Sequence, residues 1–225
     1  MIGFYNVLEL ARKYKLQVFV PSSIGAFGPN TPKKNTPQET VLGPTTMYGV
    51  IKVTSELLSN YYFKKYGLDV RGLRYPGIMA ITIPPADGTT EYSIAMMYEA
   101  VKSGKYTCFL KKDTLLPMMY MPDCINATIQ LMETPLSKLK HHADFNLTAF
   151  SFSPAELEAE IKKYIPDLKV TYKPDFRQDI ADSWPGSIDD SAARKEWGWK
   201  PKYDFKTMVK EIIELFQDLK KQGKL

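Results

Sequence analysis

The sequence predicts an α/β fold built on a parallel sheet. Helix-like and strand-like segments alternate from the start of the chain, and successive strands are far enough apart for crossover connections. We expect a helix at about 4–14, a strand at 17–20, a helix from Tyr48 to about Tyr66, and a strand at 69–75. Gly67 stands where a glycine commonly ends a helix.

The remainder of the chain continues the alternation after a stretch without pattern at 81–90. A helix is expected at 91–102, a strand and helix across 116–133 with Asp123 as the helix cap, and a strand at 143–149. Ser153, Pro154 and Glu156 have the spacing of a capping box at the start of another helix. An amphipathic helix is expected at about 204–219.

Composition excludes several classes of function. The chain has 225 residues, enough for one large domain or one and a half, and a formal net charge of +5. The basic residues are scattered, which argues against a nucleic-acid partner. No apolar run approaches the roughly 18 residues of a membrane helix. Cys108 and Cys124 lack metal or disulfide spacing, which favours a reducing compartment.

Tyr48 and Lys52 form the candidate catalytic pair. They are four positions apart and therefore share one face of the expected helix. A buried stripe is expected on the opposite face, at positions that recur in steps of three and four: Val50, Val53, Leu57, Leu58 and Tyr61. A second pair with this spacing, Tyr61 and Lys65, is interpreted as helix surface.

Ser22 and Ser23 follow the expected strand at 17–20. Ligands in open α/β sheets bind at the carboxyl ends of the strands, so these hydroxyls are candidate site residues. The alternative is an ordinary loop serine and an ordinary helix tyrosine. The Pro76–Gly77 turn after the next strand has the same ambiguity, and Thr89 could equally cap the following helix.

These motifs resemble a known enzyme family. Pro21-Ser22-Ser23-Ile24-Gly25-Ala26-Phe27-Gly28 and Tyr48-Gly49-Val50-Ile51-Lys52 look like the serine strand end and the Tyr-x-x-x-Lys of the extended short-chain dehydrogenases, the NAD-dependent epimerase/dehydratase family. Ser183-Trp184-Pro185 is similar to a motif of its L-threonine 3-dehydrogenases, which the chain resembles over essentially its whole length. The resemblance implies an incomplete Rossmann-type parallel sheet, with the N-terminal strands missing, and a smaller C-terminal α/β substrate domain.

The resemblance also implies a division of the chain. Residues 1–80, rejoined by about 115–150, would form the second half of the Rossmann domain with the catalytic Ser, Tyr and Lys. Residues 81–114 and 151–225 would belong mainly to the substrate domain and its closing helix.

Roles for individual residues follow from the resemblance. Tyr48 would remove the hydroxyl proton of a secondary alcohol, Lys52 would favour the phenolate, and Ser23 would orient the substrate hydroxyl. An unperturbed tyrosine ionises near pH 10, so a neighbouring ammonium is needed at neutral pH. The implied cofactor is NAD, contacted by Tyr48, Lys52, Tyr75, Pro76 and Ile78. The implied substrate is L-threonine, contacted by Ser22, Thr89 and Trp184.

One element of a dinucleotide site is missing from the sequence. No Gly-x-Gly-x-x-Gly follows an opening strand, so we expect the pyrophosphate-binding turn to come from a segment that this chain does not contain. Two alternatives stay open: a nucleotide-sugar epimerase or dehydratase, and an inactive remnant that only dimerises. The resemblance implies a homodimer formed through the helices at 4–15 and 46–66, and a location in mitochondria or the bacterial cytoplasm.

Overall fold

The computed structural model describes residues 1–81 and 85–225, so part of the patternless stretch at 81–90 lies outside the described residues. The chain forms two compact units. Unit 1 contains residues 1–76, 124–148 and 183–200, and unit 2 contains residues 77–123, 149–182 and 201–225. None of the described helices is long and apolar enough to cross a membrane.

Unit 1 is organised on a parallel sheet with the strand order β1 (Val18–Ser23), β2 (Val70–Tyr75) and β6 (Phe145–Asn146). The register of β1 on β2 runs from Val18 opposite Val70 to Ser23 opposite Tyr75. Both serines therefore lie at the carboxyl end of β1, beside the end of β2. The predicted parallel sheet and its first two strands are confirmed.

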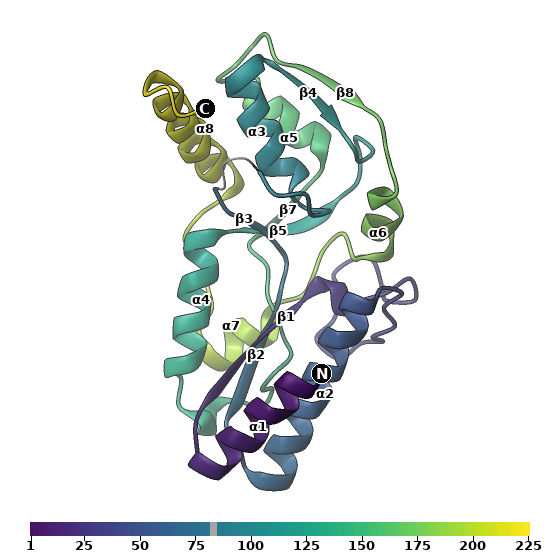
Figure 1. Cartoon of the computed structure of the whole chain (residues 1–225), viewed down its shortest axis with the longest axis vertical. Helices are drawn as coiled ribbons and strands as arrows, with labels where there is room; N and C mark the ends of the chain where they lie inside the picture. The colour runs from purple at the N-terminus through teal and green to yellow at the C-terminus, as the bar shows by residue number, and fades with distance from the viewer. Residues whose placement is uncertain (82–84) are drawn as a thin grey trace. The chain divides into compact units, whose positions relative to one another are not determined.

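Helices α1 (Ile2–Tyr14) and α2 (Met47–Tyr66) lie side by side in unit 1, as Figure 1 shows. Both helices pack against the sheet through a core cluster that includes Leu8 of α1, Tyr62 of α2, and Val20 and Val70 of the strands. The Thr46 hydroxyl accepts from the amide of Gly49 and caps α2, and Gly67 ends the helix with a φ of 67°. A left-handed residue at this position favours glycine, which explains why the predicted end of the helix is confirmed.

The predicted buried stripe of α2 is wrong for three of its five residues, although Leu58 packs against the core cluster and Val53 is half-buried. Leu57 is 63% exposed and Val50 and Tyr61 are also exposed, whereas the buried residues of the helix are Gly49, Glu56, Ser59 and Tyr62. The apolar period was interpreted correctly as a helix but assigned to the wrong face. Polar side chains of α2 reach buried partners, and part of the apolar face is left in contact with solvent.

Helix α4 (Met121–Glu133) and the turn after it are joined to β2 by a buried arginine. Arg71 donates to the carbonyl oxygens of Leu131 (2.5 Å) and Thr134 (2.6 Å), and it pairs with Asp69 at 2.8 Å. Unit 1 also contains the short helices η1 (Ile24–Ala26), η2 (Leu136–Lys138) and α7 (Ser191–Trp197).

Unit 2 contains two further sheets. In one, β3 (Gly77–Met79) is parallel to β5 (Leu116–Tyr120), and β5 is antiparallel to β7 (Phe150–Phe152). In the other, β4 (Lys105–Cys108) and β8 (Lys169–Tyr172) are parallel. The helices are α3 (Tyr92–Ser103), α5 (Pro154–Ile161), α6 (Arg177–Ser183) and α8 (Phe205–Lys221). The capping box of Ser153 and Glu156 is confirmed.

Three local expectations are corrected by the structure. The chain does not make a simple turn after β2, because the single residue Pro76 is followed directly by β3. The strand expected at 143–149 is only Phe145–Asn146. Asp123 lies inside α4 rather than at its cap, and its carboxylate accepts from the amides of Lys202 (2.9 Å) and Tyr203 (3.0 Å).

Two helical glycines provide a matched test of the packing. A Cβ atom at Gly49 would lie 2.2 Å from the carbonyl oxygen of Gly25, whereas a Cβ at Gly3 meets nothing within 4 Å. We expect Gly3→Ala to stabilise the protein by up to about 1 kcal/mol through helix propensity. Gly49→Ala should destabilise it by about 1–3 kcal/mol despite the same gain, because the backbone must shift. Urea unfolding measures both, and a Gly49→Ala variant as stable as the wild type would contradict the packing.

Candidate active site

The site begins at the carboxyl end of β1. Ser23 is the last residue of the strand and the cap of η1, where its Oγ accepts from the amide of Gly25 at 3.1 Å. This bond uses a lone pair of the oxygen and leaves the hydroxyl proton available for another acceptor. Ser23 can therefore cap η1 and still donate its hydroxyl proton to a substrate oxygen.

Tyr48 lies over Gly25 from the first turn of α2. A Cβ atom at Gly25 would be 2.8 Å from Cε1 of Tyr48 and 3.5 Å from Oγ of Ser23. The ring of Tyr48 and the hydroxyl of Ser23 thus border the same point, and only a glycine leaves room there. The Tyr48 side chain is half exposed, at 54%.

Lys52 completes the group one turn later in α2. Its Nζ donates to the carbonyl oxygen of Pro21 at 2.5 Å and lies 5.2 Å from the centre of the Tyr48 ring. The bond to Pro21 fixes the ammonium at the end of β1, on the same side as the phenol. The structure therefore brings together Ser23, Tyr48 and Lys52, which the sequence singled out as the catalytic set.

A buried ion pair fixes α2 against both strands. Glu56, 2% exposed, receives Arg74 Nη2 at 2.8 Å and Nε at 3.0 Å, and it also accepts the hydroxyl of Ser22. Bidentate pairing of this kind has a fixed geometry, so it sets the position of the helix as well as its distance from the sheet. The expectation that Ser22 contacts the substrate is corrected here, since its side chain is buried and its proton is donated to Glu56.

The same arginine reaches two further segments. Arg74 Nη1 lies 3.2 Å from the carbonyl oxygen of Gln38 and 3.2 Å from Oδ1 of Asn146. The long loop before α2 and the strand β6 are therefore held by the arginine that pairs with Glu56. Sequence reasoning missed Glu56 and Arg74. Two signals were available in the sequence. Glu56 is a carboxylate one turn after Lys52 on the same helical face, and Arg74 is a basic residue inside a strand.

Three more sequence candidates of unit 1 have mainly buried surroundings. The Tyr75 hydroxyl bonds to Thr128, and burial raises the pKa of the Tyr75 phenol. Pro76, the next residue, is also buried. Trp184 is partly buried and packs against the cluster of Ile24, Phe27 and Ile188. The indole of Trp184 is thus beside η1, directly after Ser23.

Ile78 and Thr89 belong to unit 2. Ile78 is the middle residue of β3, and Thr89 precedes the start of α3. Two residues after Thr89, burial raises the pKa of the Glu91 carboxyl above its usual range. A half-buried carboxyl beside a pair of threonines is a polar feature that the sequence analysis did not identify.

The polar groups of unit 1 fit one end of a nicotinamide cofactor. The phenol of Tyr48 and the ammonium of Lys52 can both bond ribose hydroxyls, and neither is enclosed by core side chains. No group of three or more His, Cys, Asp and Glu residues among the described parts of the chain could hold a metal ion. A phenol, an ammonium and a hydroxyl in this arrangement are the groups that acid–base catalysis on an alcohol requires.

Comparison with known proteins identifies the family. The model of the NAD dependent epimerase/dehydratase family matches residues 1–147. The chain belongs to this family. Its members are associated with a nicotinamide dinucleotide cofactor, and the chain is accordingly classed as an oxidoreductase-type enzyme.

Several relatives of the family are about half identical to the chain. An uncharacterised epimerase/dehydratase of Staphylococcus saprophyticus is 50% identical over 98% of this chain and 69% of its own length. The mitochondrial L-threonine 3-dehydrogenase of Bos taurus is 49% identical over 94% of this chain and 57% of its own length. A monomeric L-threonine 3-dehydrogenase from a metagenome, in its apo form, is 51% identical with a TM-score of 0.93, and the match covers 96% of this chain and 70% of that chain.

Glu56 and Glu160 allow a matched test of the buried ion pair. Both carboxylates are buried, but Arg74 is buried beside Glu56, whereas Lys163, the partner of Glu160, has a side chain that is 57% exposed. Glu56→Gln should destabilise the protein by about 3–5 kcal/mol, because an uncompensated guanidinium stays buried. Glu160→Gln should cost less than about 1 kcal/mol, since Lys163 can be solvated.

Urea unfolding of the two variants beside the wild type measures the difference. Equal losses of stability for Glu56→Gln and Glu160→Gln would contradict the special position of the Glu56–Arg74 pair.

Proposed function

We propose that this chain carries the catalytic residues of an NAD-dependent L-threonine 3-dehydrogenase. The observation that supports the proposal is the meeting of Ser23, Tyr48 and Lys52 at the end of β1. The choice of substrate is supported by relatives of about 50% identity that are named L-threonine 3-dehydrogenase. The reaction converts L-threonine and NAD⁺ to L-2-amino-3-ketobutyrate, NADH and a proton.

Each residue has one task in this reaction. The Tyr48 phenolate takes the proton from the 3-hydroxyl of threonine, while Ser23 donates to the oxygen of that hydroxyl and orients it. The Lys52 ammonium stabilises the phenolate and bonds the ribose. NAD, when bound, accepts the hydride that leaves C3, so the C–H and O–H bonds are exchanged for a C=O bond. The proton on Tyr48 then passes to solvent.

The remaining candidate residues are assigned around this centre. We place Tyr75, Pro76 and Ile78 beside the nicotinamide, and Thr89 and Trp184 beside the amino acid.

A second candidate substrate class is a nucleotide sugar. The observation that favours it is that the staphylococcal relatives are named epimerase/dehydratase without a substrate. The same phenol and hydroxyl would act on a sugar hydroxyl in place of the threonine hydroxyl.

Replacement of Tyr48 tests the catalytic assignment, and the chain contains its own control. Tyr48→Phe should lower threonine-dependent reduction of NAD⁺ by about 100-fold or more, the usual size of a lost acid–base group. Tyr61→Phe removes a phenol from the second Tyr-x-x-x-Lys of the same helix and should leave the rate unchanged. The assay follows NADH formation with L-threonine. In parallel, the conversion of UDP-glucose is followed by chromatography of the sugar nucleotide, because an epimerase or dehydratase returns the hydride to the sugar and releases no NADH.

Two outcomes would contradict the proposal. One is equal activity of Tyr48→Phe and Tyr61→Phe on threonine. The other is turnover of UDP-glucose by a wild-type chain that leaves threonine unchanged, which would favour the nucleotide-sugar candidate.

We also propose that two copies of the chain associate through α1 and α2, at about 4–15 and 46–66. The supporting observation is the apolar surface that both helices leave in solvent: Tyr5, Val7 and Leu10 on α1, and Val50, Ile51, Leu57 and Tyr61 on α2. Burial of such a surface would favour association. The exposure of Val50, Leu57 and Tyr61 is then explained, since a second copy would cover them.

A charge placed in this surface tests the association. Light scattering after size exclusion should give a dimer for the wild type and a monomer for Leu57→Lys, because a buried unpaired ammonium opposes association. Leu115→Lys, at an exposed leucine of unit 2, is the matched control and should stay dimeric. The metagenomic relative is a monomer, and a wild-type chain that is monomeric as well would overturn the proposal.

A further inference from the structure

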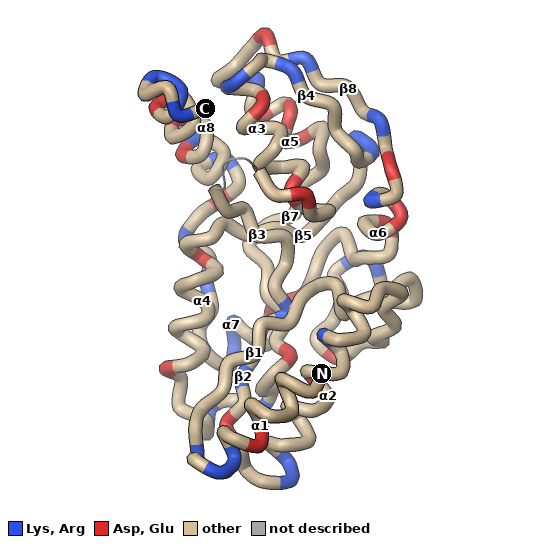
Figure 2. The backbone as a smooth tube through the Cα atoms, viewed as in Figure 1, with Lys and Arg blue, Asp and Glu red and all other residues tan. Residues whose placement is uncertain are grey.

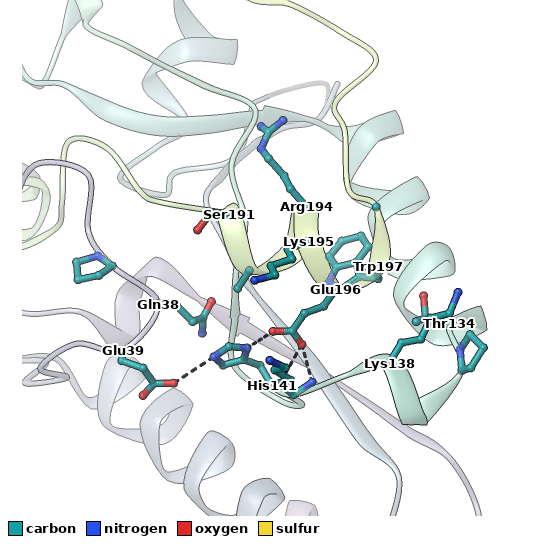
Figure 3. A pocket seen from close by; sticks show the side chains of 15 residues that line it. Gln38, Glu39, Thr134, Lys138, His141, Ser191, Arg194, Lys195, Glu196 and Trp197 are labelled. Carbon is teal, nitrogen blue, oxygen red and sulfur yellow. Dashed lines mark hydrogen bonds and ion pairs between the residues drawn. The ribbon is translucent and has the colours of Figure 1, made fainter.

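Unit 1 contains an open pocket of about 1040 Å³ that the proposed reaction does not use. Three segments line it: 37–39 before α2, 134–141 around η2, and 191–198 in and after α7 (Figure 3). None of Ser23, Tyr48 and Lys52 is among the lining residues. The pocket is large enough for a small organic ligand.

The pocket gathers uncompensated positive charge. Lys138, Lys140 and Lys195 line it and make no ion pair with other described residues. Arg194 also contributes to the lining, but its guanidinium is held by Asp190 at 2.7 Å. Figure 2 shows that Lys and Arg, and also Asp and Glu, occur throughout both units. Three unpaired ammonium groups around one hollow attract an anion.

The two carboxylates of the pocket differ in how firmly they are held. Glu196 accepts from the amides of Lys140 (2.6 Å) and His141 (3.1 Å) and from Nδ1 of His141 (2.5 Å). Its carboxylate is therefore held in place by three protein donors. Glu39 lies 3.2 Å from Nε2 of His141, its one ion pair with a described residue, and its side chain is 86% exposed. Figure 3 shows His141 between the two glutamates.

In this arrangement the Glu39 carboxylate occupies the position beside Nε2 of His141 where an anion can bind. An incoming anion can take its place at Nε2 of His141 and reach the lysines at the same time.

We propose that this pocket is a second ligand site that binds a phosphate-bearing small molecule. Phosphate carries more than one negative charge and several acceptor oxygens, which suits three separate point-charge ammonium groups better than a single carboxylate does. The ligand displaces Glu39 from His141 and bonds Nε2 of His141, with Lys140 and Lys195 around it. The proposal does not depend on threonine oxidation.

Titration with inorganic pyrophosphate tests the site in three variants. Lys195→Gln removes an attracting charge and should weaken binding about threefold, the scale of one exposed charge interaction. Glu39→Gln removes the competing carboxylate and should strengthen binding by a similar factor of about three. Lys206→Gln has the same charge change on an exposed residue of α8 in unit 2 and should leave the affinity unchanged.

Calorimetry gives the affinities, and amide chemical shifts locate the site. The expected shifts cluster at 134–141 and 191–198, and binding should weaken as sodium chloride is added. All three replaced side chains are on the surface, so each variant should keep the far-UV spectrum of the wild type. Absence of pyrophosphate binding, shifts confined to other segments, or equal affinities for Lys195→Gln and Glu39→Gln would each overturn the proposal.

Discussion

The buried pair of Glu56 and Arg74 is the interaction on which unit 1 depends. Two charges removed from water are tolerated only when their geometry is good and their remaining hydrogen-bonding capacity is used. Both conditions are met, since Arg74 approaches Glu56 through two nitrogens and Ser22 donates to the same carboxylate. The pair joins α2 to β1 and β2, so the helix cannot slide along the sheet without leaving a buried charge.

The position of the candidate catalytic residues follows from this constraint. Once α2 is fixed, its first turn lies over η1, and the absence of a side chain at Gly25 gives the Tyr48 ring its place. Lys52 reaches back to the carbonyl of Pro21, and Ser23 caps the turn between them. A helix, a strand end and one glycine are sufficient to assemble a phenol, an ammonium and a hydroxyl at the border of solvent.

Local signals in the sequence predicted much of this arrangement. The spacing of Tyr48 and Lys52, the end of α2 at Gly67 and the capping box at Ser153 depend on residues close together in the chain, and all three are present in the structure. The buried face of α2 could not be predicted in this way, because Glu56 is buried by a partner 18 positions away. The strand β3 was missed for a similar reason, since its pairing with β5 is not visible in three residues after a proline.

The most direct test of the central interaction is a double-mutant cycle of Glu56→Gln and Arg74→Met, measured by urea unfolding. If the pair fixes α2 on the sheet, each single change leaves a buried polar group without its partner, and the double change removes that conflict. The double variant should then be more stable than the sum of the single losses predicts, by about 1–3 kcal/mol. Losses that add to within about 0.5 kcal/mol would contradict the account.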